Sequence, residues 1–290
     1  MNTSTLSAPS CGSVAPSVKQ DFSLPASIIY YMTKNPSTSK LYSKMIQSCK
    51  YFFEKNSILV VYRMHNGTHI CSNSDEECQE NDEKCCINLD LSKIKSKIWL
   101  TNELHILSDS SNLLSLLRSK IYRSDITFLT IYEQRILFDD FKFFASSVTE
   151  VELRMVKIVH KNGSYVLLEN ILGAFPKIEK FTFAFNSNIS VVTSSTLQNI
   201  INLQNLEFLH HFDFMCIPEI FDVKDFSDFI EYFDDVFCFF EFKENVSQEY
   251  KNQLDQLIDT IIESQIHGHV IWYPGQNPMK RKIMENRLKN

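Results

Sequence analysis

Four cysteines in one polar segment are the strongest candidates for a metal site in this sequence. With two nearby histidines, the set is His65, His69, Cys71, Cys78, Cys85 and Cys86. Thiolates and imidazoles are the preferred ligands of structural zinc, which binds four of them at tetrahedral geometry. Six residues separate Cys71 from Cys78, and six more separate Cys78 from Cys85, and no Cys-x-x-Cys pair is present to form half of a site. Two interpretations therefore stay open: a zinc site, or a surface loop with reduced or adventitiously paired thiols.

We assign no metal and no other cofactor from this pattern, and keep zinc on Cys71, Cys78, Cys85 and Cys86 as the weaker alternative. The segment, residues 65–86, is also acidic. Its carboxylates are able to face a basic partner, although a solvated loop is the more frequent outcome of such a run. They are Asp75, Glu76, Glu77, Glu80, Asp82 and Glu83.

Cys216 is the other candidate for chemistry, because it follows His210 and His211 closely. A cysteine nucleophile needs a base within reach and a group that orients the base. Cys216 ends an apolar run, where a free cysteine usually packs as a small hydrophobic residue. Glycine-rich phosphate loops, His-Glu-x-x-His and Gly-x-Ser-x-Gly do not occur in the sequence, which has only 6 glycines. We therefore expect no enzymatic activity.

Beyond residue 97, short apolar strands alternate with amphipathic helices. The expected strands cover residues 98–106, 126–132, 151–158, 178–185, 206–214, 237–242 and 270–273. They recur every ~29 residues, inside the range of solenoid repeats. The apolar residues between them have helical spacing, with Ser247 as the N-cap of the last helix and Asp222 or Asp225 as the N-cap of the helix before it.

A strand followed by a helix, repeated with short connections, implies parallel strands with the helices outside. We expect an α/β fold in which residues 58–276 form a leucine-rich-repeat-like β-α solenoid with a mostly parallel sheet. An open doubly wound sheet is the alternative, and the solenoid is favoured because every unit steps in the same direction. The strand residues expected to point outward, toward a partner, are Glu152, Arg154, Thr182, Glu207 and Glu241.

Composition limits the possible classes of protein. The 290 residues are 44% hydrophobic and carry a net charge of -6, which fits a globular chain and argues against a nucleic-acid-binding surface. We expect residues 1–23 to be a disordered leader and residues 277–290 to be a basic tail. The sequence shows no signal peptide and no apolar stretch long enough for a membrane span. A cytoplasmic or nuclear location with reduced cysteines follows as the expectation.

The region 24–57 is expected to be a helical module, since apolar residues recur at intervals of three and four. Leu24-Pro25 with Ile28 and Ile29, followed by Ser-Cys-Lys-Tyr-Phe-Phe at residues 48–53, resembles a divergent F-box, which opens with Leu-Pro and ends with Cys-Arg/Lys and an aromatic residue. With the β-α units after it, the chain from residue 24 to 276 is similar to the nematode expanded family of F-box-like proteins with a leucine-rich-repeat-like C-terminal region.

The resemblance implies a substrate-recognition subunit of a cullin-type ubiquitin ligase. Leu24, Pro25, Ile28 and Ile29 would contact the adaptor protein of the ligase, and the repeats would hold an unknown protein substrate. The alternative is a stand-alone repeat interaction module without adaptor binding. Neither function involves nucleic acid, a membrane or catalysis.

Overall fold

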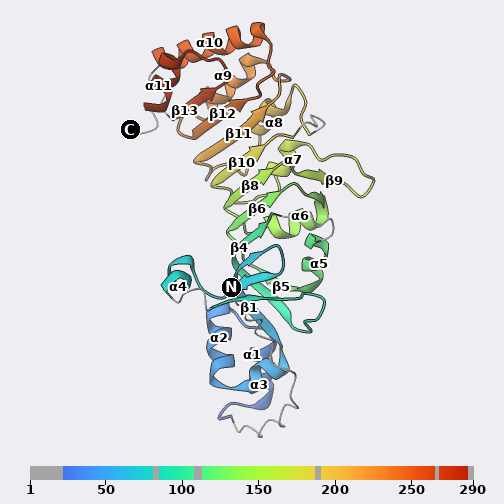
Figure 1. The fold of residues 1–290 in the computed structure, drawn as a ribbon. Coiled ribbons are helices and arrows are strands. Elements are labelled where there is room, and N and C mark those ends of the chain that lie inside the picture. Colours follow the sequence, from blue (N-terminus) through green and yellow to red (C-terminus); the bar gives the residue numbers. More distant parts are fainter. Residues whose placement is uncertain (1–21, 81–84, 108–112, 187–190, 265–267, 287–290) are drawn as a thin grey trace, which may run out of the picture.

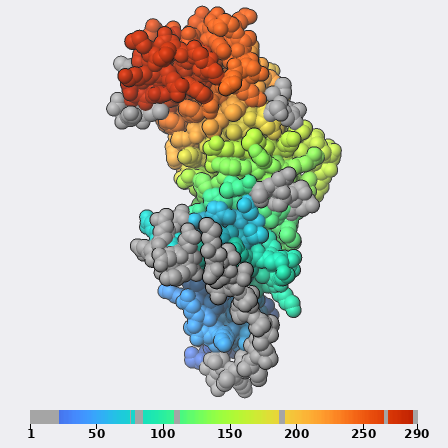
Figure 2. All heavy atoms as spheres, viewed as in Figure 1, coloured from blue at the N-terminus to red at the C-terminus, as the bar shows by residue number. Residues whose placement is uncertain are grey.

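The computed structural model describes residues 22–80, 85–107, 113–186, 191–264 and 268–286. Residues 1–21 of the expected leader and residues 287–290 of the expected tail therefore lie outside the described residues. The protein is α/β, with a mostly parallel, mixed sheet along which the helices follow (Figure 1). It is elongated, and in Figure 2 its colours run in chain order from one end to the other.

The parallel strands lie in the sheet in the order in which they occur in the chain. They are β1 (Ile58–His65), β4 (Lys97–Ile106), β6 (Phe128–Tyr132), β8 (Glu150–Arg154), β10 (Lys180–Ala184), β11 (His211–Ile217), β12 (Phe237–Phe242) and β13 (His269–Trp272). Each strand from β4 onward is added at the same edge. In a doubly wound sheet the strand order reverses at one point. Within the described residues the order of these strands does not reverse.

Short strands complete the sheets. The hairpin of β2 (His69–Cys71) and β3 (Cys86–Asn88) extends the sheet beyond β1 with antiparallel pairing. β5 (Ile121–Ser124) pairs with β4, and β7 (Arg135–Leu137) pairs with β9 (Lys157–Val159) in a separate parallel pair. These five strands were not expected from the sequence as separate elements.

The helices have the following bounds: α1 (Ala26–Lys34), α2 (Ser39–Ser48), α3 (Lys50–Lys55), α4 (Asp75–Glu80), α5 (Leu113–Lys120), α6 (Phe138–Ala145), α7 (Leu168–Leu172), α8 (Thr196–Ile201), α9 (Val223–Tyr232), α10 (Gln248–Glu263) and α11 (Pro278–Asn286). Two N-caps are confirmed. The Ser247 side chain accepts a hydrogen bond from the Tyr250 N–H at 3.2 Å, and Asp222 accepts one from the Lys224 N–H at 2.9 Å. Helix α11 occupies part of the expected tail and buries Met284.

Phenylalanine fills much of the core between the sheet and the helices. Side chains alternate between the two faces of a strand, so on β12 Phe240 is buried while its neighbour Phe239 is only partly covered. The Phe240 ring lies 5.2 Å from that of Phe226 and 5.9 Å from that of Phe229, both on α9. One continuous core therefore joins the successive strand and helix units.

Of the expected strands only 237–242 has the limits expected, and most of the others differ by one or two residues, but two differ by more. The strand expected over 206–214 begins only at His211. Leu206 and Phe208 continue the two-residue alternation of Phe212 and Phe214, but they lie in a turn. Glu207 lies in this turn. The strand expected over 151–158 is two strands, since Met155 adopts a left-handed conformation (φ 54°) between β8 and β9.

The helices α1 to α3 form a small module with its own core. Ile29, Met45 and Phe52 are buried together there. The module is joined to the sheet by a second cluster of Tyr42, Ile58 and Trp99. The Tyr42 hydroxyl accepts a hydrogen bond from the Ile58 N–H at 3.2 Å, which links α2 directly to the first strand.

Candidate functional site

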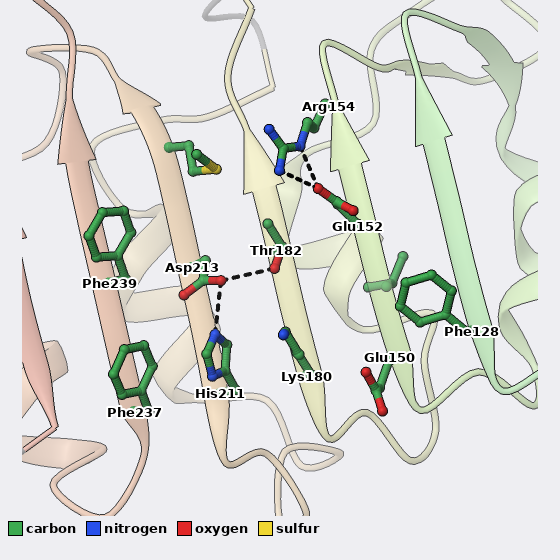
Figure 3. Close-up of a pocket in the computed structure, with 12 residues that line it drawn as sticks. Phe128, Glu150, Glu152, Arg154, Lys180, Thr182, His211, Asp213, Phe237 and Phe239 are labelled. Atoms are coloured by element: carbon green, nitrogen blue, oxygen red, sulfur yellow. Dashed lines mark hydrogen bonds and ion pairs between the residues drawn. The ribbon is translucent and has the colours of Figure 1, made fainter. Parts of the chain in front are cut away.

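One face of the sheet is not covered by helices and is a candidate binding surface. We call it the open face (Figure 3). It forms a hollow of about 400 Å³ across five neighbouring strands, from β6 to β12. Its lining includes Phe128, Glu150, Glu152, Arg154, Lys180, Thr182, His211, Asp213, Met215, Phe237 and Phe239. Successive side chains alternate across a strand, so these residues point away from the phenylalanine core.

Parallel register arranges these side chains in rows. The first row is Phe128, Glu150, Lys180, His211 and Phe237. The second row is Thr130, Glu152, Thr182, Asp213 and Phe239. Each row has polar or charged groups in its middle and a phenylalanine at the β12 end. Aromatic residues beside polar groups are the composition typical of protein-binding surfaces.

A hydrogen-bonded group holds the centre of the open face. The Thr182 hydroxyl donates to Oδ2 of Asp213 at 3.1 Å, and Nε2 of His211 lies 2.9 Å from the same oxygen. The His211 ring also stacks on Phe237 at a centroid distance of 4.5 Å. The other carboxylate oxygen of Asp213 is buried and has no hydrogen-bond partner among the described residues.

A charged pair lies beside this group. Arg154 forms an ion pair with Glu152, two residues away on β8, and both side chains point to the open face (Figure 3). The guanidinium group of Arg154 also lies 5.4 Å from the centre of the Tyr132 ring. The pair and the ring contact fix the position of a long, otherwise mobile side chain, which lowers the entropic cost of using it in binding.

Three of the five residues predicted to contact a partner meet on the open face: Glu152, Arg154 and Thr182. Glu241 lies farther along β12, level with Trp272 of β13. Glu207 does not join them, because it lies in the turn before β11 and not on a strand. The sequence-based prediction missed the aromatic residues and the His211–Asp213 pair. The two-residue alternation that identified Glu152 and Arg154 would have identified them too, had it been applied to every strand.

Cys216 is exposed, so the expectation that it packs in the core is wrong. It sits at a bulge in β11, where the register with β12 shifts between Phe214 and Ile217, and it has a φ of 57°. The bulge turns the side chain outward. Desolvation of the sulfur and the charge of Glu241 raise the pKa of the Cys216 thiol, which is the opposite of what a nucleophile needs.

The residues predicted to contact an adaptor divide into two groups. Leu24 and Ile28 are 48% and 47% exposed, and Pro25 is exposed as well. Ile29 is only 5% exposed and packs with Met45 and Phe52, so its assignment to this surface is wrong. Adjacent residues of a helix differ by about 100° in direction, so Ile29 points into the core of the helical module while Ile28 points outward.

The four cysteines of the polar segment come together at the β2–β3 hairpin. Their Sγ atoms all lie within 4.8 Å of one another. Sγ of Cys71 is 3.3 Å from Sγ of Cys85, and Sγ of Cys78 is 3.3 Å from Sγ of Cys86. Asp82 and Glu83 of the acidic run lie outside the described residues, while Glu76 and Glu77 are exposed on α4.

The two histidines near the cysteines belong to a different cluster. The His65 ring stacks on His105 of β4 at 4.4 Å, and Nε2 of His105 lies 3.1 Å from Oε2 of Glu103. Nε of Arg63 is 2.8 Å from the same carboxylate oxygen. His65 is therefore placed among cationic and imidazole groups that disfavour its protonation.

This cluster predicts a dependence of stability on pH. Burial, followed by His105 and Arg63, lowers the pKa of His65 to about 4. The unfolded chain protonates this histidine near pH 6.5. As the pH falls from about 6.5 toward 4, the unfolded state binds more protons and stability is lost. We expect a loss on the order of 1 kcal/mol from this group, because the side chain keeps partial contact with water.

His65→Phe is expected to flatten this pH dependence. The free energy of unfolding in urea is measured for both proteins at about pH 7 and about pH 5, inside the predicted window. The control is His160→Phe, since His160 is exposed and lies outside the cluster. Equal losses of stability in the wild type and His65→Phe would contradict the prediction.

Comparison with known proteins adds no family to these observations. No protein-family model matches the chain, and a search of curated proteins finds no match. Within the described residues, none of the helices has both the length and the apolar character needed to cross a bilayer.

Proposed function

We propose that this protein is a protein-binding scaffold and the substrate-recognition subunit of a cullin-type ubiquitin ligase. In this proposal the helices α1 to α3 are an F-box-like module that docks to the adaptor of the ligase. The strand and helix units from β4 onward are a leucine-rich-repeat-like solenoid that holds a protein substrate on its open face. The proposal assigns no enzymatic activity to the chain and locates it in the reducing environment of the cytoplasm or nucleus.

The observation that carries the proposal is an exposed apolar stripe on a module whose own core is already closed. Leu24 lies in the bend just before α1, and Ile28 and Tyr31, three residues apart on α1, share one helix face. They are 48%, 47% and 66% exposed. The core of the module is made by other residues of the same helices. The stripe is thus not needed for folding, and an exposed apolar row of this kind is typical of a protein-binding surface.

The order of the strands supports the solenoid. From β4 to β13 each unit pairs with the one before it, always at the same edge, and every pairing is parallel. Stacked units of this type hide each other's apolar faces and expose a long continuous surface. The open face is such a surface, and its rows of polar and aromatic side chains cross several units.

The open face suits a folded or extended protein segment better than a small molecule. It is a wide, shallow surface whose hollow spans five strands. Deep enclosure on most sides is the usual property of small-molecule sites. Phe237 and Phe239 provide flat apolar area at one side, and the ion pair of Arg154 with Glu152 provides oriented polar contacts.

The test is binding of the purified full-length chain to the adaptor subunit of a cullin-type ubiquitin ligase. We expect direct binding, and we expect the double substitution Leu24→Asp with Ile28→Asp to weaken it by about 100-fold, since two charges replace central apolar contacts. Isothermal titration calorimetry measures both affinities. Both positions are exposed, so circular dichroism should show that the variant stays folded.

Phe208→Asp is the matched control. Phe208 is an equally exposed apolar residue, at 50%, but it lies in the turn before β11 and not in the helical module. The control variant is expected to bind the adaptor as the wild type does. If the wild type does not bind, the ubiquitin-ligase function is excluded, and the protein is then a stand-alone repeat interaction module.

A further inference from the structure

We propose that Cys71, Cys78, Cys85 and Cys86 bind one structural Zn²⁺ ion. Zinc with four thiolates is tetrahedral with Zn–S bonds of about 2.3 Å, which places the sulfur atoms about 3.8 Å from one another. The four Sγ atoms lie within 4.8 Å of one another, and two of the separations are 3.3 Å. The sulfur–sulfur distance expected for a zinc–thiolate tetrahedron therefore lies between the 3.3 Å separations and the 4.8 Å limit of this cluster.

The fold brings the four cysteines together from separate elements. Their spacing in the sequence therefore does not match a zinc-binding motif. Cys71 ends β2 and Cys86 begins β3, and the antiparallel register pairs these two residues. Helix α4 lies between the two strands in sequence and brings Cys78 to the pair. Cys85 precedes β3 directly, in a turn, so that both members of the adjacent pair reach the cluster.

The local chemistry also calls for a cation. Cys71 and Cys78 are only 3% and 5% exposed, so their sulfur atoms are largely removed from water. Four sulfurs this close resist ionising together. A divalent ion at their centre removes this repulsion and binds all four as thiolates.

Sulfur ligands and compact geometry select the ion. Calcium and magnesium prefer oxygen ligands, whereas a tetrahedral set of four sulfurs is typical of zinc or iron–sulfur centres. Clusters with several iron and sulfide ions require a wider cage than these four Sγ atoms form. Two disulfides, Cys71 with Cys85 and Cys78 with Cys86, are the competing chemistry, and the test below distinguishes them from zinc.

A metal here would stabilise a part of the sheet that has little other support. The β2–β3 hairpin forms the outer edge beyond β1, and α4 lies outside the compact core. Short edge hairpins are marginal in water without further crosslinks. Zinc bound at this position would fasten α4 to both strands of the hairpin. This role is independent of adaptor binding, so either proposal is able to fail without the other.

The test measures the metal content of the full-length chain purified with a reducing agent. Inductively coupled plasma mass spectrometry is expected to find one Zn²⁺ per chain. After removal of zinc and addition of Co²⁺, thiolate-to-cobalt charge-transfer absorption and intense d–d bands of a tetrahedral site are expected. Cys78→Ser and Cys85→Ser should each remove the stoichiometric metal, whereas Cys216→Ser, at an exposed cysteine outside the cluster, should keep it.

A measurement on the wild type keeps the proposal testable if a cysteine variant fails to fold. A mercurial reagent added to the native protein should release the zinc in step with modification of four thiols, and limited proteolysis should then cut between residues 72 and 85. Iron in place of zinc, or no stoichiometric metal in the reduced protein, would overturn the proposal. So would two disulfides, identified by peptide mass spectrometry in protein that lacks metal.

Discussion

Phe240→Ala is expected to lower the free energy of unfolding by about 3–5 kcal/mol, whereas Phe239→Ala should lower it by less than about 1 kcal/mol. The two residues are neighbours on β12, and their side chains point to opposite faces of the sheet. Phe240 is fully buried, in ring contact with Phe226 and Phe229 of α9. Phe239 lies on the open face. Loss of the Phe240 ring leaves a cavity, while loss of the Phe239 ring removes only partly solvated surface.

Chemical denaturation followed by far-ultraviolet circular dichroism measures both values under the same conditions. The matched pair controls for strand position and for the propensity of alanine, because the two substitutions are identical and adjacent. Similar losses for the two variants would show that the open face is as closely packed as the core. That result would also remove the open face as a candidate binding surface.

Trp99→Ala is expected to cost about 3–5 kcal/mol as well, and to loosen the attachment of the helical module to the sheet. Trp99 is completely buried in the cluster with Tyr42 and Ile58. Its indole N–H donates to Oδ2 of Asp125 at 2.8 Å, and the guanidinium group of Arg123 lies 5.1 Å from the ring centre. The substitution removes a large apolar side chain and leaves the Asp125 carboxylate without this donor.

The second tryptophan of the chain provides the control. Trp272 lies on β13 at the far edge of the sheet, is only partly buried, and contacts Arg281 at 4.9 Å from the ring centre. Trp272→Ala is expected to cost about 1 kcal/mol. Hydrogen exchange should show faster exchange in α1 to α3 for Trp99→Ala only. Unchanged exchange there would mean that the module is held by contacts other than this cluster.

Local patterns in the sequence were sufficient for the general class of the fold and for many of its elements. The α/β class and the mostly parallel sheet are confirmed. The apolar run Phe-Cys-Phe-Phe-Glu-Phe predicted β12 with the limits that the structure gives, 237–242. The N-cap at Ser247 was predicted, and Asp222 is one of the two residues predicted for the helix before it, since a cap depends on a few adjacent residues and hardly on the rest of the chain.

Features that depend on contacts between distant residues could not be read in this way. The turn that contains Glu207 has the alternation of a strand, and only the burial of Leu206 and Leu209 against the core shows that it is not one. Ile28 and Ile29 are chemically the same, and the packing of α1 on Met45 and Phe52 determines which of them is hidden. The sequence around these two residues does not by itself show which of them is buried.

The candidate sites show the same division. Residue types were visible from the start: four cysteines in one segment, an apolar N-terminal helix, and charged residues on the strands. The sequence did not show which of these residues lie together in space. The pairing of Cys71 with Cys86 depends on strand register. The rows of the open face depend on the alignment of five strands. Register is set by the summed burial of whole strands. Composition and periodicity thus define the units of this protein, while the packing of each unit on the next determines which side chains share a surface.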